Sequence, residues 1–147
     1  MPARESIPDP FRIAISGPTA IHVATHAARN FAELAGIGVV DVSRLAIVVE
    51  ELVTNLYDHG GLEVDDVFEI ALSTTIADIR IMIIDRGRSF DPGTASPFSP
   101  VPARGGGAGL RLLHDWATHM EYRTSTGQNR LSVVLPRSNG QSRSEKP

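Results

Sequence analysis

The sequence predicts an α/β (α+β) two-layer sandwich, in which a mixed, mostly antiparallel sheet is covered on one face by about three helices. Three segments repeat apolar residues at helical spacing, and five shorter segments read as strands between turn signals. Their order is strand, helix, helix, strand, strand, helix, strand, strand. At 147 residues the chain is long enough to form one domain with a real core.

The first half supplies one strand and two helices. We expect a flexible leader over residues 1–9, a strand from about residue 10, and a helix that begins at Pro18 and Thr19 and ends at Gly36. A second helix begins with Asp41 as its N-cap and stops at a glycine pair. The apolar stripes are Ala20, Ala24, Ala27, Phe31 and Leu34 in the first helix, and Leu45, Val48, Val49, Leu52, Val53 and Leu56 in the second.

The second half supplies the remaining strands and one more helix. The segments 67–75 and 79–85 read as a hairpin whose second strand is central. Residues 88–108 are rich in Gly, Pro and Ser and too long for an ordinary connection, so they predict a lid or binding loop. A helix and a second hairpin follow. The predicted domain spans 10–136, and a disordered tail covers 137–147.

Composition excludes several classes of function. The net charge of −3 gives no overall positive charge that would attract nucleic acid. The absence of cysteine excludes disulfides and thiolate metal sites. Lys146 is the only lysine, so neither a P-loop nor a protein kinase of the common type can be built. No apolar stretch resembles a signal peptide or could cross a bilayer. We therefore expect a cytoplasmic protein without a membrane partner.

The second predicted helix carries polar residues at steps of four. Glu51, Asn55 and His59 lie on one helical face beside a good apolar stripe. Taken alone, this pattern is more often a solvated face, with His59 near the negative end of the helix dipole. The functional alternative uses the Asn55 amide oxygen as a ligand for Mg²⁺ and Glu51, one turn away, as a base.

Two further motifs follow the central strand. Asp85 ends that strand and could accept a hydrogen bond from an exocyclic amine, and Gly87 would let a flat ring approach the backbone; the same letters also suit a simple turn. The glycine cluster at 105–109 runs into a helix, whose first N–H groups form an anion site. Glycine clusters are otherwise often flexible linkers.

Together and in this order, the motifs resemble the ATP-binding module of the GHKL superfamily, which has the Bergerat fold and includes gyrase, heat-shock chaperone ATPases, histidine kinases and mismatch-repair ATPases. The segment 51–55 with His59 and Gly60 is similar to the N box of that superfamily. The segment 85–87 with 90–92 is similar to its G1 box, and residues 105–110 are similar to its G2 box. The resemblance covers about residues 10–136.

Within the superfamily, the amino-acid sequences of residues 50–55 and of the last hairpin are most similar to those of single-domain anti-sigma-factor serine/threonine kinases. That resemblance implies ATP and Mg²⁺ as cofactors. It also implies a STAS-type anti-sigma antagonist as the phosphorylated protein and a sigma factor as a second partner. By resemblance, Glu51 is the general base and Asn55 the metal ligand. The remaining nucleotide contacts would be Asp85, Gly87, Phe90, Gly105, Gly107, Gly109 and Leu110, with His59 and Arg104 as phosphate-side helpers.

Two other functions stay open from the sequence. The chain could be a nucleotide-binding module that is catalytically weak or inactive and regulates a partner by binding. It could also be an ATP-hydrolysing switch in which Glu51 orients water. A histidine kinase is disfavoured, because too few residues precede Glu51 to hold a phosphoacceptor helical hairpin as well. A homodimer is compatible with all of these.

Overall fold

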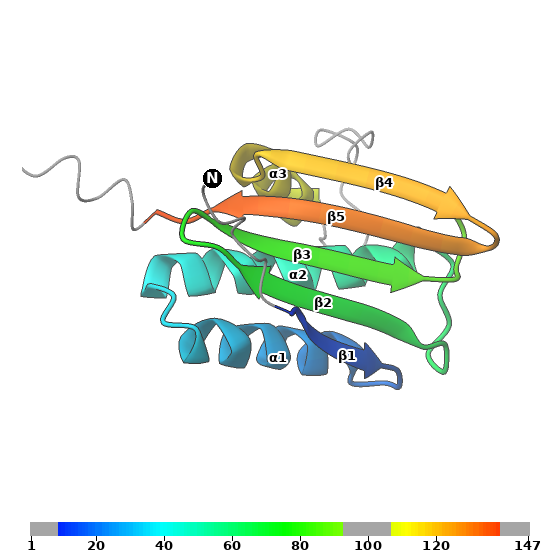
Figure 1. Ribbon diagram of the computed structural model, residues 1–147. Coiled ribbons are helices and arrows are strands. Elements are labelled where there is room, and N and C mark those ends of the chain that lie inside the picture. Colours follow the sequence, from blue (N-terminus) through cyan, green and yellow to red (C-terminus); the bar gives the residue numbers. More distant parts are fainter. Residues whose placement is uncertain (1–8, 93–106, 139–147) are drawn as a thin grey trace, which may run out of the picture.

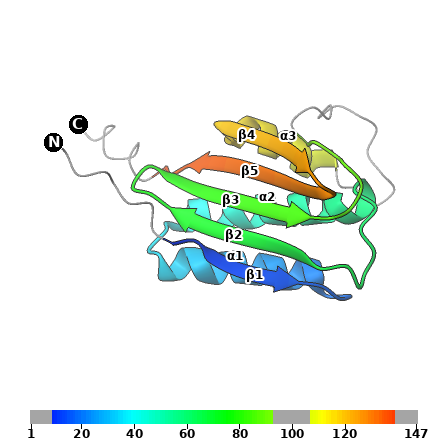
Figure 2. The ribbon, with the colours of Figure 1, turned by 45° about the vertical axis from the view of Figure 1, so that its right-hand side comes forward.

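A computed structural model describes residues 9–92 and 107–138. It forms a two-layer sandwich of one five-stranded sheet and three helices, as predicted (Figures 1 and 2). The strands lie in the order β1-β2-β3-β5-β4, and each of the pairings is antiparallel. The elements are β1 (Phe11–Ile15), α1 (Ala20–Leu34), α2 (Val39–Asp58), β2 (Phe68–Thr74), β3 (Asp78–Asp85), α3 (Gly107–Trp116), β4 (His119–Ser125) and β5 (Gln128–Pro136).

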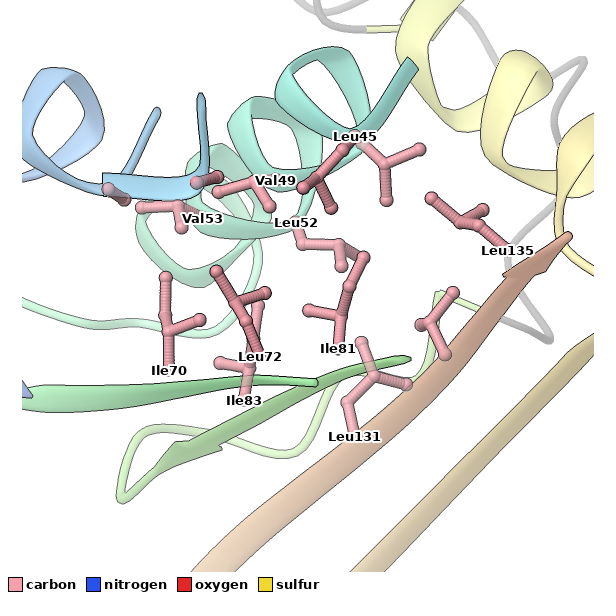
Figure 3. Close-up of a cluster of buried hydrophobic side chains, with 14 of the residues drawn as sticks. Leu45, Val49, Leu52, Val53, Ile70, Leu72, Ile81, Ile83, Leu131 and Leu135 are labelled. Atoms are coloured by element: carbon pink, nitrogen blue, oxygen red, sulfur yellow. The ribbon is translucent and has the colours of Figure 1, made fainter. Parts of the chain in front are cut away.

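The core lies between α2 and the three central strands (Figure 3). The predicted apolar stripe of α2, apart from the partly buried Leu56, is buried against the inward-facing residues of β2, β3 and β5. Side chains alternate faces along a strand and recur every turn along a helix. The central members of this core are Leu45, Val49, Leu52, Val53, Ile70, Leu72, Ile81 and Ile83, all at most 2% exposed. This packing sets the position of α2 on the face of the sheet.

The α1 helix buries Ala20 and Ala24 of the predicted stripe, but its second half buries a different set of residues. Ala28 and Ala32 are fully buried, whereas Leu34 is 82% exposed and Ala27 only half-buried. The buried positions are alanines spaced four apart, a row of small side chains that lets α1 lie close to α2. Phe31 lies at the margin of this interface, where its ring stacks on Phe11 of β1.

Asp41 is not the N-cap that the sequence suggested. Gly38 occupies that position, and Asp41 lies inside the first turn of α2 with 2% of its surface exposed. Its carboxylate accepts hydrogen bonds of 2.9 Å from the backbone N–H and the hydroxyl of Ser138. Ordered structure therefore continues beyond the predicted domain end at residue 136. No helix in the described ranges is long and apolar enough to cross a membrane.

Candidate functional site

The C-terminal ends of α2 and β3 lie at the same end of the molecule (Figure 1), and Asn55 of α2 and Asp85 of β3 line one cavity there. Glu51 and Asn55 project from one face of α2 and are 7% and 6% exposed. His59 follows the helix as its C-cap residue, and the Asn55 carbonyl accepts the N–H groups of His59 and Gly60. Glu51 and Asn55 are therefore buried rather than solvated, whereas His59 is exposed.

Glu51 has an unusual acidity. Burial raises the pKa of its carboxyl from 4.5 to about 7, and the carboxylates of Asp58 and Glu50 add to the shift. The Asn55 amide opposes it, but the Asn55 Nδ2 makes no hydrogen bond of normal geometry with any described residue. Burial is therefore the dominant cause of the raised pKa of Glu51. Near neutral pH, Glu51 can both take up and release a proton.

The first turns of α3 lie directly on Glu51. A Cβ atom added to Gly109 would be 2.1 Å from Glu51 Oε1, a distance that no side chain could tolerate. Only glycine lets the α3 backbone approach the carboxyl this closely. The N-terminal end of α3 and the candidate base thus form one site, although they are far apart in the sequence.

Asp85 ends β3 and is held by a neighbour that the sequence patterns did not single out. Its Oδ1 accepts hydrogen bonds from the Gly87 N–H at 2.8 Å and from Asn129 Nδ2 at 3.0 Å. Asn129 lies opposite Asp85 in the β3–β5 pairing and also donates to the Gly87 carbonyl at 2.9 Å. Asn129 is 4% exposed. The Asp85 carboxylate is fixed through Oδ1, and no described residue donates a hydrogen bond to Oδ2, which could therefore accept one from a ligand.

Gly87 joins the turn after β3 to the end of α2. A Cβ atom at this position would lie 2.4 Å from the Gly60 carbonyl oxygen, so the two backbones could not meet with any other residue there. The Arg88 N–H donates to the same carbonyl. In this structure the closest neighbour of Gly87 is the protein backbone, and the predicted approach of a flat ring stays a prediction.

A small cavity of about 20 Å³ lies between α2, β3 and β5. That is room for about one water molecule. Its apolar walls include Leu52, Ile83 and Leu131, and its polar groups include Asn55 and Asp85. Phe90 also lines it; the Phe90 ring stacks on His59 with centroids 4.6 Å apart, and its N–H donates to the Tyr122 hydroxyl. A purine could enter only if side chains at the opening moved.

Two further predicted residues, Gly107 and Leu110, lie in α3. Leu110 is 9% exposed and packs into the core, and Gly107 is the first residue of α3. Arg104, Gly105 and most of the predicted lid lie outside the described residues. Within the described ranges, no three or more His, Asp or Glu side chains come together as a metal site. A cation here would therefore depend on few protein ligands.

The raised pKa of Glu51 predicts a pH-dependent stability. Between about pH 4.5 and 7, the folded protein holds a proton that the unfolded chain has lost, so stability falls as pH rises through this window. Glu51→Gln removes the effect. The free energy of unfolding of the variant should exceed that of the parent by about 1–3 kcal/mol at about pH 8, and should differ little from it at about pH 4. Thermal unfolding across this range measures the gain. Glu33→Gln, on the exposed surface of α1, is the control; a gain that does not vary with pH would contradict the burial of Glu51.

Comparison with known proteins now identifies the class. The sequence matches the histidine kinase-like ATPase domain family over residues 16–135, and the chain belongs to this family. The predicted superfamily is confirmed at that level. No curated protein matches the sequence at a significant level.

Two solved structures share the fold. The blue-light activated histidine kinase EL346 of Erythrobacter litoralis has a TM-score of 0.52 and 18% identity, with 72% of this chain and 33% of that chain covered. The present chain therefore spans about a third of the length of that kinase. A chain of the SiaB–SiaC complex from Pseudomonas aeruginosa has a TM-score of 0.55 and 12% identity, with 90% and 92% covered. At such identities the likeness establishes the fold alone.

Proposed function

We propose that the chain is an ATP- and Mg²⁺-dependent serine/threonine protein kinase of the anti-sigma-factor type. It phosphorylates a small STAS-type antagonist protein and sequesters a sigma factor in the cytoplasm. The observation that carries the proposal is the Glu51 carboxyl, which is buried against Gly109, lies one helical turn from Asn55 and has a pKa of about 7. A general base works best with a pKa near the operating pH.

The described residues fit an adenine nucleotide. Asp85 offers one carboxylate oxygen that no described residue bonds, at the edge of a cavity with apolar walls. Such a group accepts a hydrogen bond from an exocyclic amine, while the walls cover the ring. The N–H groups at the start of α3 suit phosphate oxygens. ATP supplies the phosphoryl group, and Glu51 accepts the proton of the serine or threonine hydroxyl.

Asn55 fits a role as the protein ligand of Mg²⁺. Its buried Nδ2 has no hydrogen-bond partner among the described residues, and such a group costs stability until a ligand or water satisfies it. Mg²⁺ binds through few protein oxygens and keeps waters and phosphate oxygens. The Asn55 side chain can offer its oxygen to the cation and its N–H groups to an acceptor on the nucleotide.

Asn55→Ala should therefore remove the dependence of nucleotide affinity on Mg²⁺. The parent should bind ATP more tightly when Mg²⁺ is added, whereas the variant should show the same affinity with and without it. Titration calorimetry in both conditions measures the difference. Asn30→Ala, on the exposed surface of α1, should behave as the parent. An equal Mg²⁺ response in Asn55→Ala and the parent would exclude Asn55 as the ligand.

A complex with a partner protein is supported by the second structural match. That chain comes from a two-protein complex, and the likeness extends over 92% of it and 90% of the present chain. A domain of this size and fold can therefore work as one half of a protein pair. This supports a protein acceptor over a purely self-contained ATPase.

One observation favours a second candidate, a binding module or an ATP-hydrolysing switch. Glu51 is only 7% exposed and lies under the α3 backbone at Gly109. A protein hydroxyl can reach it only after α3 shifts, whereas a water molecule needs far less room. Incubation with γ-labelled ATP separates the three functions: label on a partner protein supports the kinase, free phosphate alone the switch, and bound ATP without turnover the binding module.

A further inference from the structure

Arg88 lies at the opening of the cavity beside Asp85. Its side chain is exposed, yet it lines the cavity together with Asn55, Asp85 and Phe90. It is the one cationic side chain among the described residues that line this cavity. A purine cannot enter the roughly 20 Å³ available without displacing long side chains at the opening, and Arg88 is one of them.

The local backbone holds Arg88 in this position. Its N–H donates to the Gly60 carbonyl, which anchors the residue at the end of α2. The guanidinium then lies over Gly61: a Cβ atom there would be 3.0 Å from one terminal nitrogen and 3.3 Å from Nε. Gly61 has a φ of +67°, a conformation that favours glycine. The Gly60 carbonyl therefore anchors the Arg88 backbone, and the absence of a side chain at Gly61 leaves room for the guanidinium.

The guanidinium is available for a ligand. Among the described residues, the cationic members of ion pairs are Arg12, Arg80, Arg123 and His119, and Arg88 forms no ion pair with a described residue. No described side chain accepts a hydrogen bond from it either. Guanidinium groups are weakly hydrated and planar, so they stack on aromatic rings as readily as they bind anions.

The position along α2 decides between these two roles. The proposed phosphate end of the site is at Glu51 and Gly109, whereas Arg88 sits beside Gly60 and Gly61. Seven helical residues follow Glu51 before α2 ends at Asp58, a rise of about 10 Å at 1.5 Å per residue, and Gly60 lies beyond that end. Asp85, the proposed hydrogen-bond partner of the purine, is only three residues from Arg88. The guanidinium therefore lies at the end of the site that would hold the purine.

We propose that Arg88 is a nucleotide-binding residue whose guanidinium stacks on the face of the purine held at its edge by Asp85. This inference rests on the proposed nucleotide site. On binding, Arg88 swings out to admit the base and closes over it. A cation over an aromatic face contributes through its attraction to the ring, and the contribution grows as water is excluded.

Titration of the full chain with adenosine, AMP and Mg²⁺-ATP tests the assignment. Arg88→Ala should weaken binding of all three by a similar factor, about threefold to thirtyfold. Arg88→Lys, which keeps the charge and loses the planar group, should recover only part of the loss. The matched control is Arg86→Ala: Arg86 is equally charged, exposed and two residues away, but lines a different hollow. It should stay within about twofold of the parent.

Failure of the Arg88 stacking role and failure of the proposed nucleotide site give different results. If the parent binds adenosine and Arg88→Ala binds it equally well, the stacking role is wrong. A loss that grows from adenosine to AMP to ATP would make Arg88 a phosphate contact and overturn it as well. A parent that binds neither adenosine nor ATP would overturn the proposed nucleotide site together with the inference.

Discussion

Glu51→Gln is expected to bind ATP as the parent does and to phosphorylate its protein substrate about 10²- to 10⁴-fold more slowly. Glutamine keeps the shape that fits beneath Gly109 and loses the ability to take up the hydroxyl proton. With the pKa of Glu51 raised to about 7, the parent should become faster as pH rises towards that value and then level off. The residual rate of the variant should lack this dependence.

Rates of phosphoryl transfer under single-turnover conditions measure the effect apart from product release. The control is Glu33→Gln, which removes an exposed acid on α1. It should phosphorylate at nearly the parental rate. If Glu51→Gln is as fast as the parent, Glu51 has no part in the chemistry and the binding-module reading takes precedence.

Asp85→Asn should lower ATP affinity about ten- to a hundredfold while leaving the fold intact, because a charge-assisted hydrogen bond contributes roughly 1.5–3 kcal/mol. The amide oxygen of Asn can replace Oδ1 and keep the bonds from Gly87 and Asn129. The amide nitrogen then takes the place of Oδ2 and presents a donor to a donor. The loss should therefore be confined to ligand binding.

Titration calorimetry with ATP measures the affinity, and thermal unfolding checks the fold. Asp78→Asn removes the same charge at the other end of β3 and should bind ATP normally. Parental affinity in Asp85→Asn would mean that this carboxylate does not contact the base. Unfolding of the variant would instead mean that the Asp85–Asn129 pair is mainly structural.

The layers of the fold and the pairing of the polar residues could be predicted because both depend on short sequence periods. The stripe of α2 fixes which face turns to the sheet, and the same period places Glu51 and Asn55 together. The apolar run of β3 ends at Asp85, which puts a carboxylate at the edge of the sheet. Local pattern is sufficient for each of these.

Asn129 and Tyr122 could not be assigned to the site in this way. They contact Asp85 and Phe90 from 44 and 32 residues further along the chain. Those contacts depend on the pairing and register of β5 with β3 and of β4 with β5, which no local period specifies. The available signal for Asn129 was a single amide beside the turn of the last hairpin, and such residues are common in turns.

The stripe of α1 and the N-cap of α2 were each predicted from a local pattern that allowed more than one solution. Alanines recur around α1, so more than one stripe satisfies the helical period, and packing against α2 selected Ala28 and Ala32. Asp41 has the residue type of an N-cap, but a partner 97 residues away, Ser138, holds it inside the first turn. In both cases tertiary contacts chose among solutions that the sequence allowed.

The most direct measurement is the fate of the γ-phosphate when the full chain is incubated with labelled ATP, Mg²⁺ and small candidate antagonist proteins from the same organism. A protein kinase built on this site should place the label on a serine or threonine of one such protein, and at limiting ATP both Asp85→Asn and Glu51→Gln should label it much more slowly than the parent. Protein-bound label should exceed free phosphate. Release of free phosphate with every candidate protein left unlabelled would contradict phosphoryl transfer to a protein hydroxyl.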